Sequence, residues 1–166
     1  DANGEFVRNP EVDLVKVAVV ERHQGTGNVA CGFLKGYGIK EGAVALSIAH
    51  DSHNIIVVGV SDEEMEFAVN SLIEQEGGMV LVKEGKVIES MPMPIAGLMS
   101  DQSGEWVDQK LTDIHEKAYE ELGICGDVEP VMTLCFMSLA VIPEIKLTDM
   151  GLFDVTTFSF IPVEAE

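Results

Sequence analysis

Two nearly continuous apolar runs, at residues 43–49 and 55–60, constrain the fold of this chain more than any other feature. Both are rich in β-branched residues, which favour strands. A strand with one face in water alternates apolar and polar side chains, and these runs do not alternate. We therefore expect two strands that are buried on both faces. Residues 12–20 indicate a third strand, and residues 31–34 are a further candidate.

Two amphipathic segments are predicted to form helices that pack on the sheet. Ser61 and Glu64 form an S-x-x-E capping box, in which each side chain binds a free backbone N–H of the other residue. Gly77-Gly78 ends this first helix. A second helix is expected over residues 103–122 and ends at Gly123. The apolar stripes are Met65, Ala68, Val69, Leu72 and Ile73 in the first helix, and Val107, Leu111, Ile114, Ala118 and Leu122 in the second.

A hairpin and an apolar loop are expected between the two helices. Glu84-Gly85 predicts a tight turn between residues 79–83 and 86–89, because Gly in second place fits a two-residue turn. Residues 91–99 contain two prolines, which lack the N–H group that a helix or a central strand needs. This apolar segment is therefore expected to be a loop that is either covered or meets a partner.

The remaining segments complete an α+β fold. Residues 133–142 are apolar and are stopped by Pro143, and residues 155–163 are predicted as a last strand. The expected architecture is mixed β-sheets layered with two main helices, in two or three layers. A complete (β/α)₈ barrel is excluded, because 166 residues fall short of the ~200 that small barrels use. We expect one domain at residues 11–166, after a disordered or tag-like segment at residues 1–10.

The charge balance excludes two classes of partner. The chain has 10 Lys and Arg against 29 Asp and Glu, which gives a net charge of −19. Such a surface repels phosphate backbones and anionic lipids, so neither nucleic acid nor a membrane surface is an expected partner. No apolar run reaches the length of about 18 residues that a membrane span needs. The sequence begins at Asp1 without Met or a signal peptide, and we interpret it as a processed or excised piece.

Three cysteines, Cys31, Cys125 and Cys135, indicate free thiols. Their number is odd, and their spacing matches no zinc or disulfide pattern. All three lie next to apolar or Gly positions, so we expect buried thiols in a reducing cytoplasm.

Polar loops next to the apolar strands hold the candidate functional residues. His50-Asp-Ser-His-Asn54 could bring two imidazoles and Asp51 to one metal ion or ligand, although Asp, Ser and Asn are also ordinary turn formers. Residues 21–28 end the first strand with a second polar cluster. His115, in the second helix, is interpreted as a solvated residue. The candidates are Glu21, His23, Thr26, Asn28, His50, Asp51, Ser52, His53 and Asn54.

Six blocks, taken in order, make the sequence resemble the C-terminal domain of bacterial adenine deaminase over residues 15–155. They are Val-Ala-Val-Val-Glu-Arg-His (17–23), Thr-Gly-Asn (26–28), Gly-Phe-Leu-Lys-Gly-Tyr-Gly (32–38), Ala-His-Asp-Ser-His-Asn (49–54), Pro-Ile-Ala-Gly-Leu-Met-Ser (94–100) and Val-Ile-Pro-Glu-Ile-Lys-Leu-Thr-Asp (141–149).

The resemblance implies a function for a longer protein. That family hydrolyses adenine to hypoxanthine and ammonia, with iron or manganese in a catalytic barrel activating the attacking water. The barrel's metal ligands begin with an H-x-H pair, which this chain lacks, so no catalytic residue is carried over. The expectation is a module that packs on the barrel, with residues 21–28 and 50–54 at the active-site mouth. This module alone is expected to be inactive and to require no cofactor of its own.

Three alternatives remain open at this point. His50, Asp51 and His53 are candidates for an accessory metal site in that module. The chain could instead be a free-standing binding or assembly module, or a homo-oligomer, that uses the apolar loop at residues 91–99 as its contact surface. A small metallohydrolase using His50, Asp51, His53 and His23 is the third reading.

Overall fold

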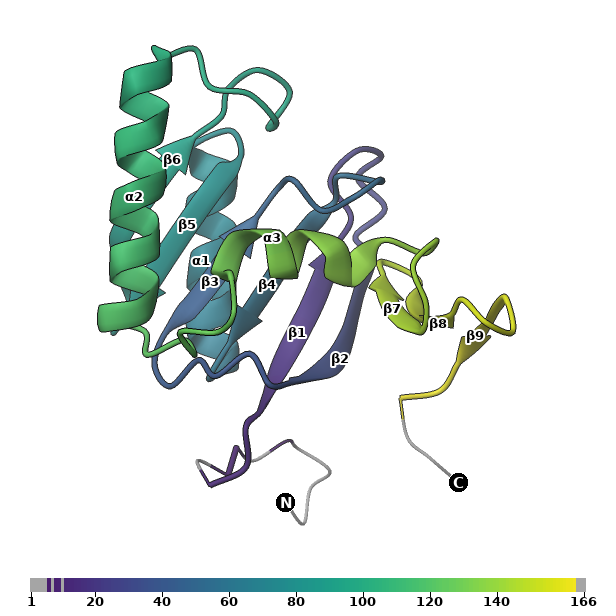
Figure 1. The fold of residues 1–166 in the computed structure, drawn as a ribbon. Helices are drawn as coiled ribbons and strands as arrows, with labels where there is room; N and C mark the ends of the chain where they lie inside the picture. The colour runs from purple at the N-terminus through teal and green to yellow at the C-terminus, as the bar shows by residue number, and fades with distance from the viewer. Residues whose placement is uncertain (1–5, 7, 10, 164–166) are drawn as a thin grey trace.

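The apolar runs form the centre of a six-stranded sheet in the computed structural model, which describes residues 6, 8–9 and 11–163 (Figure 1). The strand order is β2-β1-β4-β3-β5-β6. Every residue of β3 and β4 is buried, as the apolar runs predict. The strands are β1 (Leu14–Val20), β2 (Val29–Lys35), β3 (Ala43–Leu46), β4 (Ile55–Gly59), β5 (Gly78–Lys83) and β6 (Lys86–Pro92).

The α+β class is confirmed, and the pairing of the strands is simpler than the mixed sheets that the sequence suggested. All five pairings in this sheet are antiparallel. Parallel neighbours need long crossovers, whereas here the chain turns back directly between β1 and β2, β3 and β4, and β5 and β6. Glu84-Gly85 makes the last of these turns, with φ values of +52° and +67° that fit the predicted hairpin.

Helix α1 (Asp62–Glu74) covers one face of the sheet, behind it in Figure 1. Met65, Ala68 and Leu72 are buried there. The Ser61 Oγ accepts the Glu64 N–H at 3.3 Å, which is half of the predicted capping box. The other half does not form as predicted, because the Glu64 Oε1 accepts the Gly85 N–H at 3.2 Å. Glu64 therefore ties the helix to the hairpin turn.

The opposite face carries α2 (Gly104–Glu120), α3 (Pro130–Cys135) and the 3₁₀ helix η1 (Phe136–Ser138). The buried Tyr37 hydroxyl donates to the Pro130 carbonyl at 2.8 Å and holds α3 on the sheet. His115 pairs with Glu129, whose carboxylate also caps α3. The interpretation of His115 as a solvated residue is incomplete, because its side chain is 33% exposed and also joins α2 to α3.

A second, three-stranded antiparallel sheet packs on β2, on the face of the large sheet that points away from α1. It consists of β7 (Ile145–Thr148), β8 (Gly151–Asp154) and β9 (Ser159–Ile161). The last strand predicted at residues 155–163 is present but shorter, as β9, because the Asp154 carboxylate accepts hydrogen bonds from Thr156 and Thr157 and turns the chain before it. A Cβ at Gly32 would lie 3.3 Å from the Leu152 side chain, so β2 and β8 meet closely.

Several local predictions change once the chain is folded. Met91 and Pro92 extend the edge strand β6, and only the following residues form the predicted loop. All three cysteines are free, but only Cys135 is buried, while Cys31 and Cys125 are exposed. No helix in the described part of the chain is long and apolar enough to cross a membrane.

The segment expected to be disordered or tag-like lies mostly outside the described residues. Of its three described residues, Phe6 packs against Phe33 with ring centroids 4.7 Å apart and the rings tilted by 44°. The Arg8 guanidinium donates to the carbonyls of Ile39 and Lys40 at 2.7 and 2.8 Å.

Candidate functional site

Three loops meet at one end of the six-stranded sheet because of its strand register. Val20, at the end of β1, pairs with Val29 at the start of β2 and with Ile55 at the start of β4. The loops at residues 21–28 and 47–54 therefore leave the sheet side by side. At the same end, β6 finishes beside the start of β5 and leads into the loop at residues 93–103. We call these the three end loops.

Arg22 binds all three end loops to one another. Its Nε donates to the His53 carbonyl at 2.5 Å, and its Nη2 donates to the Ala96 carbonyl at 2.9 Å. Its backbone N–H donates to the Asn54 Oδ1 at 3.3 Å. Burial lowers the pKa of Arg22, yet a guanidinium stays charged at any physiological pH. One cation thus fixes the spacing of segments that lie up to 74 residues apart in the sequence.

Ser47 links the third end loop to strand β5 of the sheet. This buried hydroxyl donates to the Gly97 carbonyl at 2.5 Å and accepts the Gly78 N–H at 2.7 Å. Gly97 has φ +72°, and a Cβ there would lie 2.9 Å from the Arg22 Nη1. Glycine is therefore required at this position both for the backbone and for the approach of the guanidinium.

Glu21 organises the first end loop. Its carboxylate accepts the N–H groups of His23, Gln24 and Thr26 at 2.5, 2.7 and 3.1 Å, together with the Thr26 hydroxyl. These donors, with the Thr26 N–H the strongest, lower the Glu21 pKa from 4.5 to about 2. Asn28 closes the loop, since its carbonyl accepts the Glu21 N–H at 2.9 Å. Glu21, Thr26 and Asn28 therefore shape the loop.

The second end loop brings His50 and His53 together. Their ring centroids are 5.5 Å apart in an edge arrangement, and His50 also stacks on Phe136 at 5.1 Å. The Ser138 hydroxyl donates to the His50 carbonyl at 3.0 Å. The His23 Nε2 donates to the Ser52 carbonyl at 2.7 Å, so the first and second end loops also touch here. Three histidines therefore share one end of the sheet.

The charge state of His53 follows from its surroundings. Burial lowers the His53 pKa, and His50 and the Arg22 guanidinium lower it further. His53 is therefore neutral at pH 7 and has a free lone pair on one ring nitrogen. Its Nδ1 is buried and has no hydrogen-bond partner among the described residues.

The end loops do not form a metal centre of their own. Among residues 6, 8–9 and 11–163, no group of three or more His, Cys, Asp or Glu side chains is arranged to hold a metal ion. The His50 Nδ1 lies 3.7 Å from the Asp51 carboxylate, and Asp51 is exposed. The resemblance implies an iron or manganese centre in a catalytic barrel, and the described donors of the end loops do not form such a centre.

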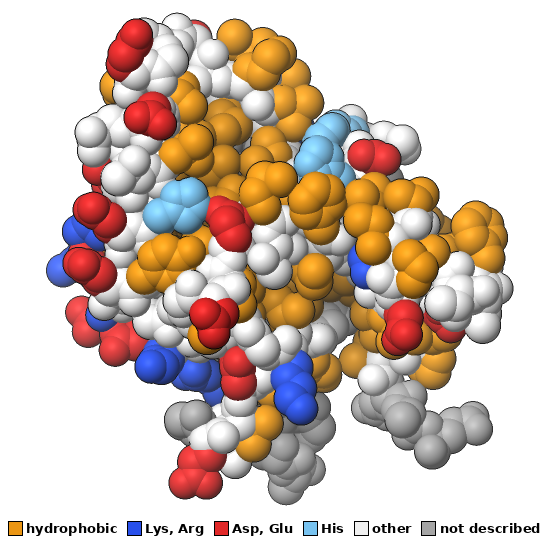
Figure 2. Space-filling model, viewed as in Figure 1, with side chains coloured by type: hydrophobic (Ala, Val, Ile, Leu, Met, Phe, Trp, Pro, Cys, Tyr) orange, Lys and Arg blue, Asp and Glu red, His pale blue; other side chains and the backbone are white. Residues whose placement is uncertain are grey.

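Apolar side chains surround the histidines on the same face of the molecule. Figure 2 shows histidines beside an acidic group, with apolar groups spread around them. A groove of about 440 Å³ runs next to Asp51 and Ser52 and is lined further by Val141, Met150 and Phe160. Val141 and Met150 are 70% and 71% exposed, so this face has the composition of a contact surface.

Sequence reasoning missed the residues that assemble the site. Arg22 lay inside a quoted block without being selected, because a charge that binds distant carbonyls leaves no local pattern. Ser47 was missed because it lies within an apolar run. The signal that could have found both is the loop topology: two polar loops and a glycine-containing apolar loop all leave one end of the sheet.

Comparisons with known proteins agree with the resemblance in the sequence. Residues 1–159 match the family described as Adenine deaminase C-terminal domain. The chain is 71% identical over 165 residues to Adenine deaminase 2 of Desulfotalea psychrophila, covering 99% of this chain and 29% of that protein. It is 51% identical over 166 residues to Adenine deaminase of Ligilactobacillus salivarius, covering 100% of this chain and 29% of that protein.

A third relative is covered over a similar share of its length. The chain is 49% identical over 160 residues to Adenine deaminase of Bacillus subtilis, covering 96% of this chain and 28% of that protein. The chain therefore spans less than a third of the length of the curated relatives that it matches.

The first prediction concerns Arg22→Ala. Losing its charge-assisted hydrogen bonds, worth about 1.5–3 kcal/mol each, should speed amide hydrogen exchange at least about tenfold in residues 50–54 and 94–100. Arg22→Lys should give an intermediate rate, because an ammonium lacks the planar fork that reaches both carbonyls. Lys35→Ala, at an exposed position on β2, is the control. Unchanged exchange in both loops would show that Arg22 does not join them.

The second prediction concerns the pH dependence of the first end loop. The folded pKa of Glu21, about 2, lies below its ordinary value of 4.5, so its stabilising effect is complete above pH ~4.5 and is lost as pH falls through about 2. Carboxyl NMR titration should place the Glu21 midpoint near 2, and Thr26→Val should raise it by removing one donor. A Glu21 midpoint near 4.5 in the unaltered chain is the contrary result.

Proposed function

This chain belongs to the adenine deaminase C-terminal domain family, and we propose that it acts as the C-terminal module of a metal-dependent adenine deaminase. The parent enzyme would convert adenine and water to hypoxanthine and ammonia. The chain covers only 29% of Adenine deaminase 2 of Desulfotalea psychrophila, so the greater part of such a protein lies outside it. We place the catalytic barrel in that part.

The three end loops are proposed to face the mouth of the barrel. One observation carries this assignment: blocks 21–28, 50–54 and 94–100, which are far apart in the sequence, are fastened together by Arg22. A module that only filled space would not need three loops held in register at one point. The exposed apolar groups around the histidines supply a surface that packs on the barrel.

The chain's own residues have a supporting chemical role in this proposal. An iron or manganese ion in the barrel would supply a water of lowered pKa. Here, neutral His53 can accept or donate one hydrogen bond at the mouth, and Arg22 holds its backbone in place. The apolar rim would exclude bulk water from the entrance. The three unpaired thiols are consistent with a cytoplasmic location for the enzyme.

A second candidate function is a free-standing binding or assembly module. The exposed side chains of Ile95 and Met99, 46% and 57% accessible in the third end loop, are the observation that favours it. The same exposure is expected of an interdomain contact, and the family membership favours that reading. Nothing in the described residues supports the small metallohydrolase.

The third prediction tests the division of labour between module and barrel. The pure 166-residue chain, supplied with Fe²⁺ or Mn²⁺, should show no conversion of adenine to hypoxanthine, because no described cluster can hold the ion. The full-length protein encoded by the same gene should deaminate adenine under the same conditions. Ammonia release and chromatography of the purines measure both. Turnover by the 166-residue chain alone would overturn the proposal.

The fourth prediction tests the placement of the end loops. In the full-length enzyme, His53→Ala should lower kcat/KM by about tenfold or more, with the metal content unchanged, because the side chain shapes the mouth and binds no metal. Lys86→Ala, in the hairpin at the opposite end of the sheet, is the control and should leave kcat/KM unchanged. Unchanged kcat/KM in the His53 variant would refute this placement.

A further inference from the structure

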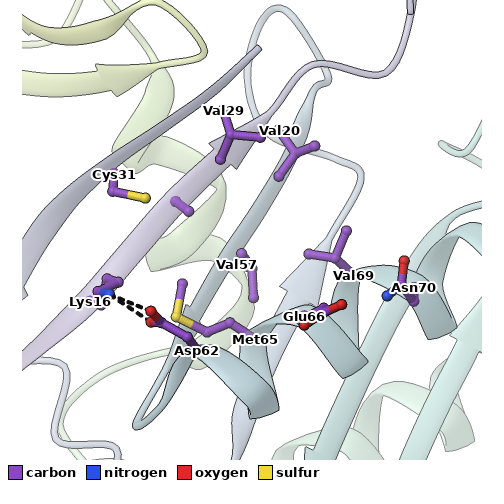
Figure 3. A pocket seen from close by; sticks show the side chains of 11 residues that line it. Lys16, Val20, Val29, Cys31, Val57, Asp62, Met65, Glu66, Val69 and Asn70 are labelled. Atoms are coloured by element: carbon purple, nitrogen blue, oxygen red, sulfur yellow. Dashed lines mark hydrogen bonds and ion pairs between the residues drawn. The ribbon is translucent and has the colours of Figure 1, made fainter. Parts of the chain in front are cut away.

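A second hollow lies on the α1 side of the sheet, between α1 and the edge strand β2 (Figure 3). We call it the α1–β2 groove. It has a volume of about 310 Å³, and an ion pair between Lys16 and Asp62, 2.6 Å long, lies at its rim. Its apolar lining comes from Ala18, Val20, Val29, Cys31, Val57, Met65 and Val69.

The groove is open because α1 is narrower than the sheet. The apolar residues of α1 pack over β3, β4 and β5, and they leave β1 and β2 beyond the helix. The side chains of β2 alternate, so that Gly32 lies under the small sheet while Val29 and Phe33 face the other way. Val29 and Phe33 are 56% and 45% exposed.

The same strand also offers a free backbone edge. β2 is the outermost strand of its sheet, and no further strand of the described chain pairs with it. An exposed edge beside an apolar groove invites pairing with other chains, and proteins usually cover such edges. An extended segment could pair with the backbone of β2 and place alternate apolar side chains against Val29 and Cys31.

The chain itself indicates what arrives at this groove. The ring of Phe6 packs at a tilt against Phe33, so the polypeptide entering the domain already lies on the groove side of β2. A hollow lined by Phe6, Phe33, Lys16 and Asp62 continues from that contact, and the last two residues also line the α1–β2 groove. A second copy of the chain is disfavoured as the occupant, because each copy has a net charge of −19.

We infer that the α1–β2 groove is the docking site for the polypeptide that precedes residue 1 in the longer protein, seated as an extended apolar segment along β2. This inference rests on the proposed function, which makes the chain the C-terminal module of that protein. The groove is separate from the three end loops, so the module would be held at two surfaces. One surface serves the active-site mouth, and the other anchors the domain.

Native cysteines provide the probe for this contact. Cys31 lies in the groove and is exposed, whereas Cys125 is exposed in the segment between α2 and α3. Labelling with N-ethylmaleimide, resolved by peptide mass spectrometry, should be at least about tenfold slower at Cys31 in the full-length protein than in the 166-residue chain. Cys125 should not slow to the same extent. Equal rates at Cys31 in the two proteins, or equal slowing of both thiols, would overturn the inference.

A matched pair of variants makes the test specific. Val29→Asp and Val87→Asp each place a charge at an exposed valine on an edge strand, β2 and β6 respectively. In the full-length protein, Val29→Asp should return Cys31 labelling to the rate of the 166-residue chain, and Val87→Asp should not. The same effect from both variants would contradict a specific contact.

Two further readouts separate this inference from its rivals. If Cys31 in the 166-residue chain labels faster on dilution, a second copy covers the groove and the inference is wrong. Adenine turnover is scored on the same full-length samples. Protection of Cys31 without adenine turnover supports the docking site and refutes the proposed function. Adenine turnover without protection of Cys31 supports the proposed function and refutes the docking site.

Discussion

Burial of β3 and β4 on both faces is the constraint on which the rest of this structure depends. Apolar strands without a wet face need a layer on each side, and α1 on one side with α2 and α3 on the other provide it. Because both faces of these strands are covered, the polar side chains and free backbone groups near them lie at the ends and edges of the sheet. The three polar or glycine-containing loops therefore lie at a sheet end, and the free backbone edges lie along β2 and β6.

The end loops show how a few hydrogen bonds can assemble a site without a metal or a nucleophile. Arg22 and Ser47 act on backbone carbonyls, and Glu21 acts on backbone N–H groups. Such contacts fix the chain path, while the His50 ring packs on Phe136 and the buried Nδ1 of His53 has no hydrogen-bond partner among the described residues. This division suits a module that shapes an entrance whose chemistry is supplied elsewhere.

The sequence predicted the elements that have a strong local signal. Periodicity located α1 and α2, and Glu84-Gly85 located the hairpin, because these features depend on residues close together in the chain. Local reasoning made the last strand at residues 155–163 too long, because the Asp154 carboxylate turns the chain before β9 begins. It also suggested buried positions for Cys31 and Cys125, because apolar neighbours in sequence do not show whether another layer covers a strand. Strand order and the Arg22 contacts are long-range, so no short pattern reveals them.

Arg22 has a consequence for the electrostatic potential of the molecule. Its guanidinium binds carbonyl oxygens, and none of the ion pairs between described residues involves it. Its unit charge is therefore not cancelled by a carboxylate partner, on a chain whose net charge is −19. The carboxylates of Glu21 and Asp51 lie in the same end loops, so the Arg22 charge offsets part of their negative charge on an acidic surface. Arg22 is the only Lys or Arg in the three end loops, so its loss would remove their hydrogen bonds and also leave them more negative.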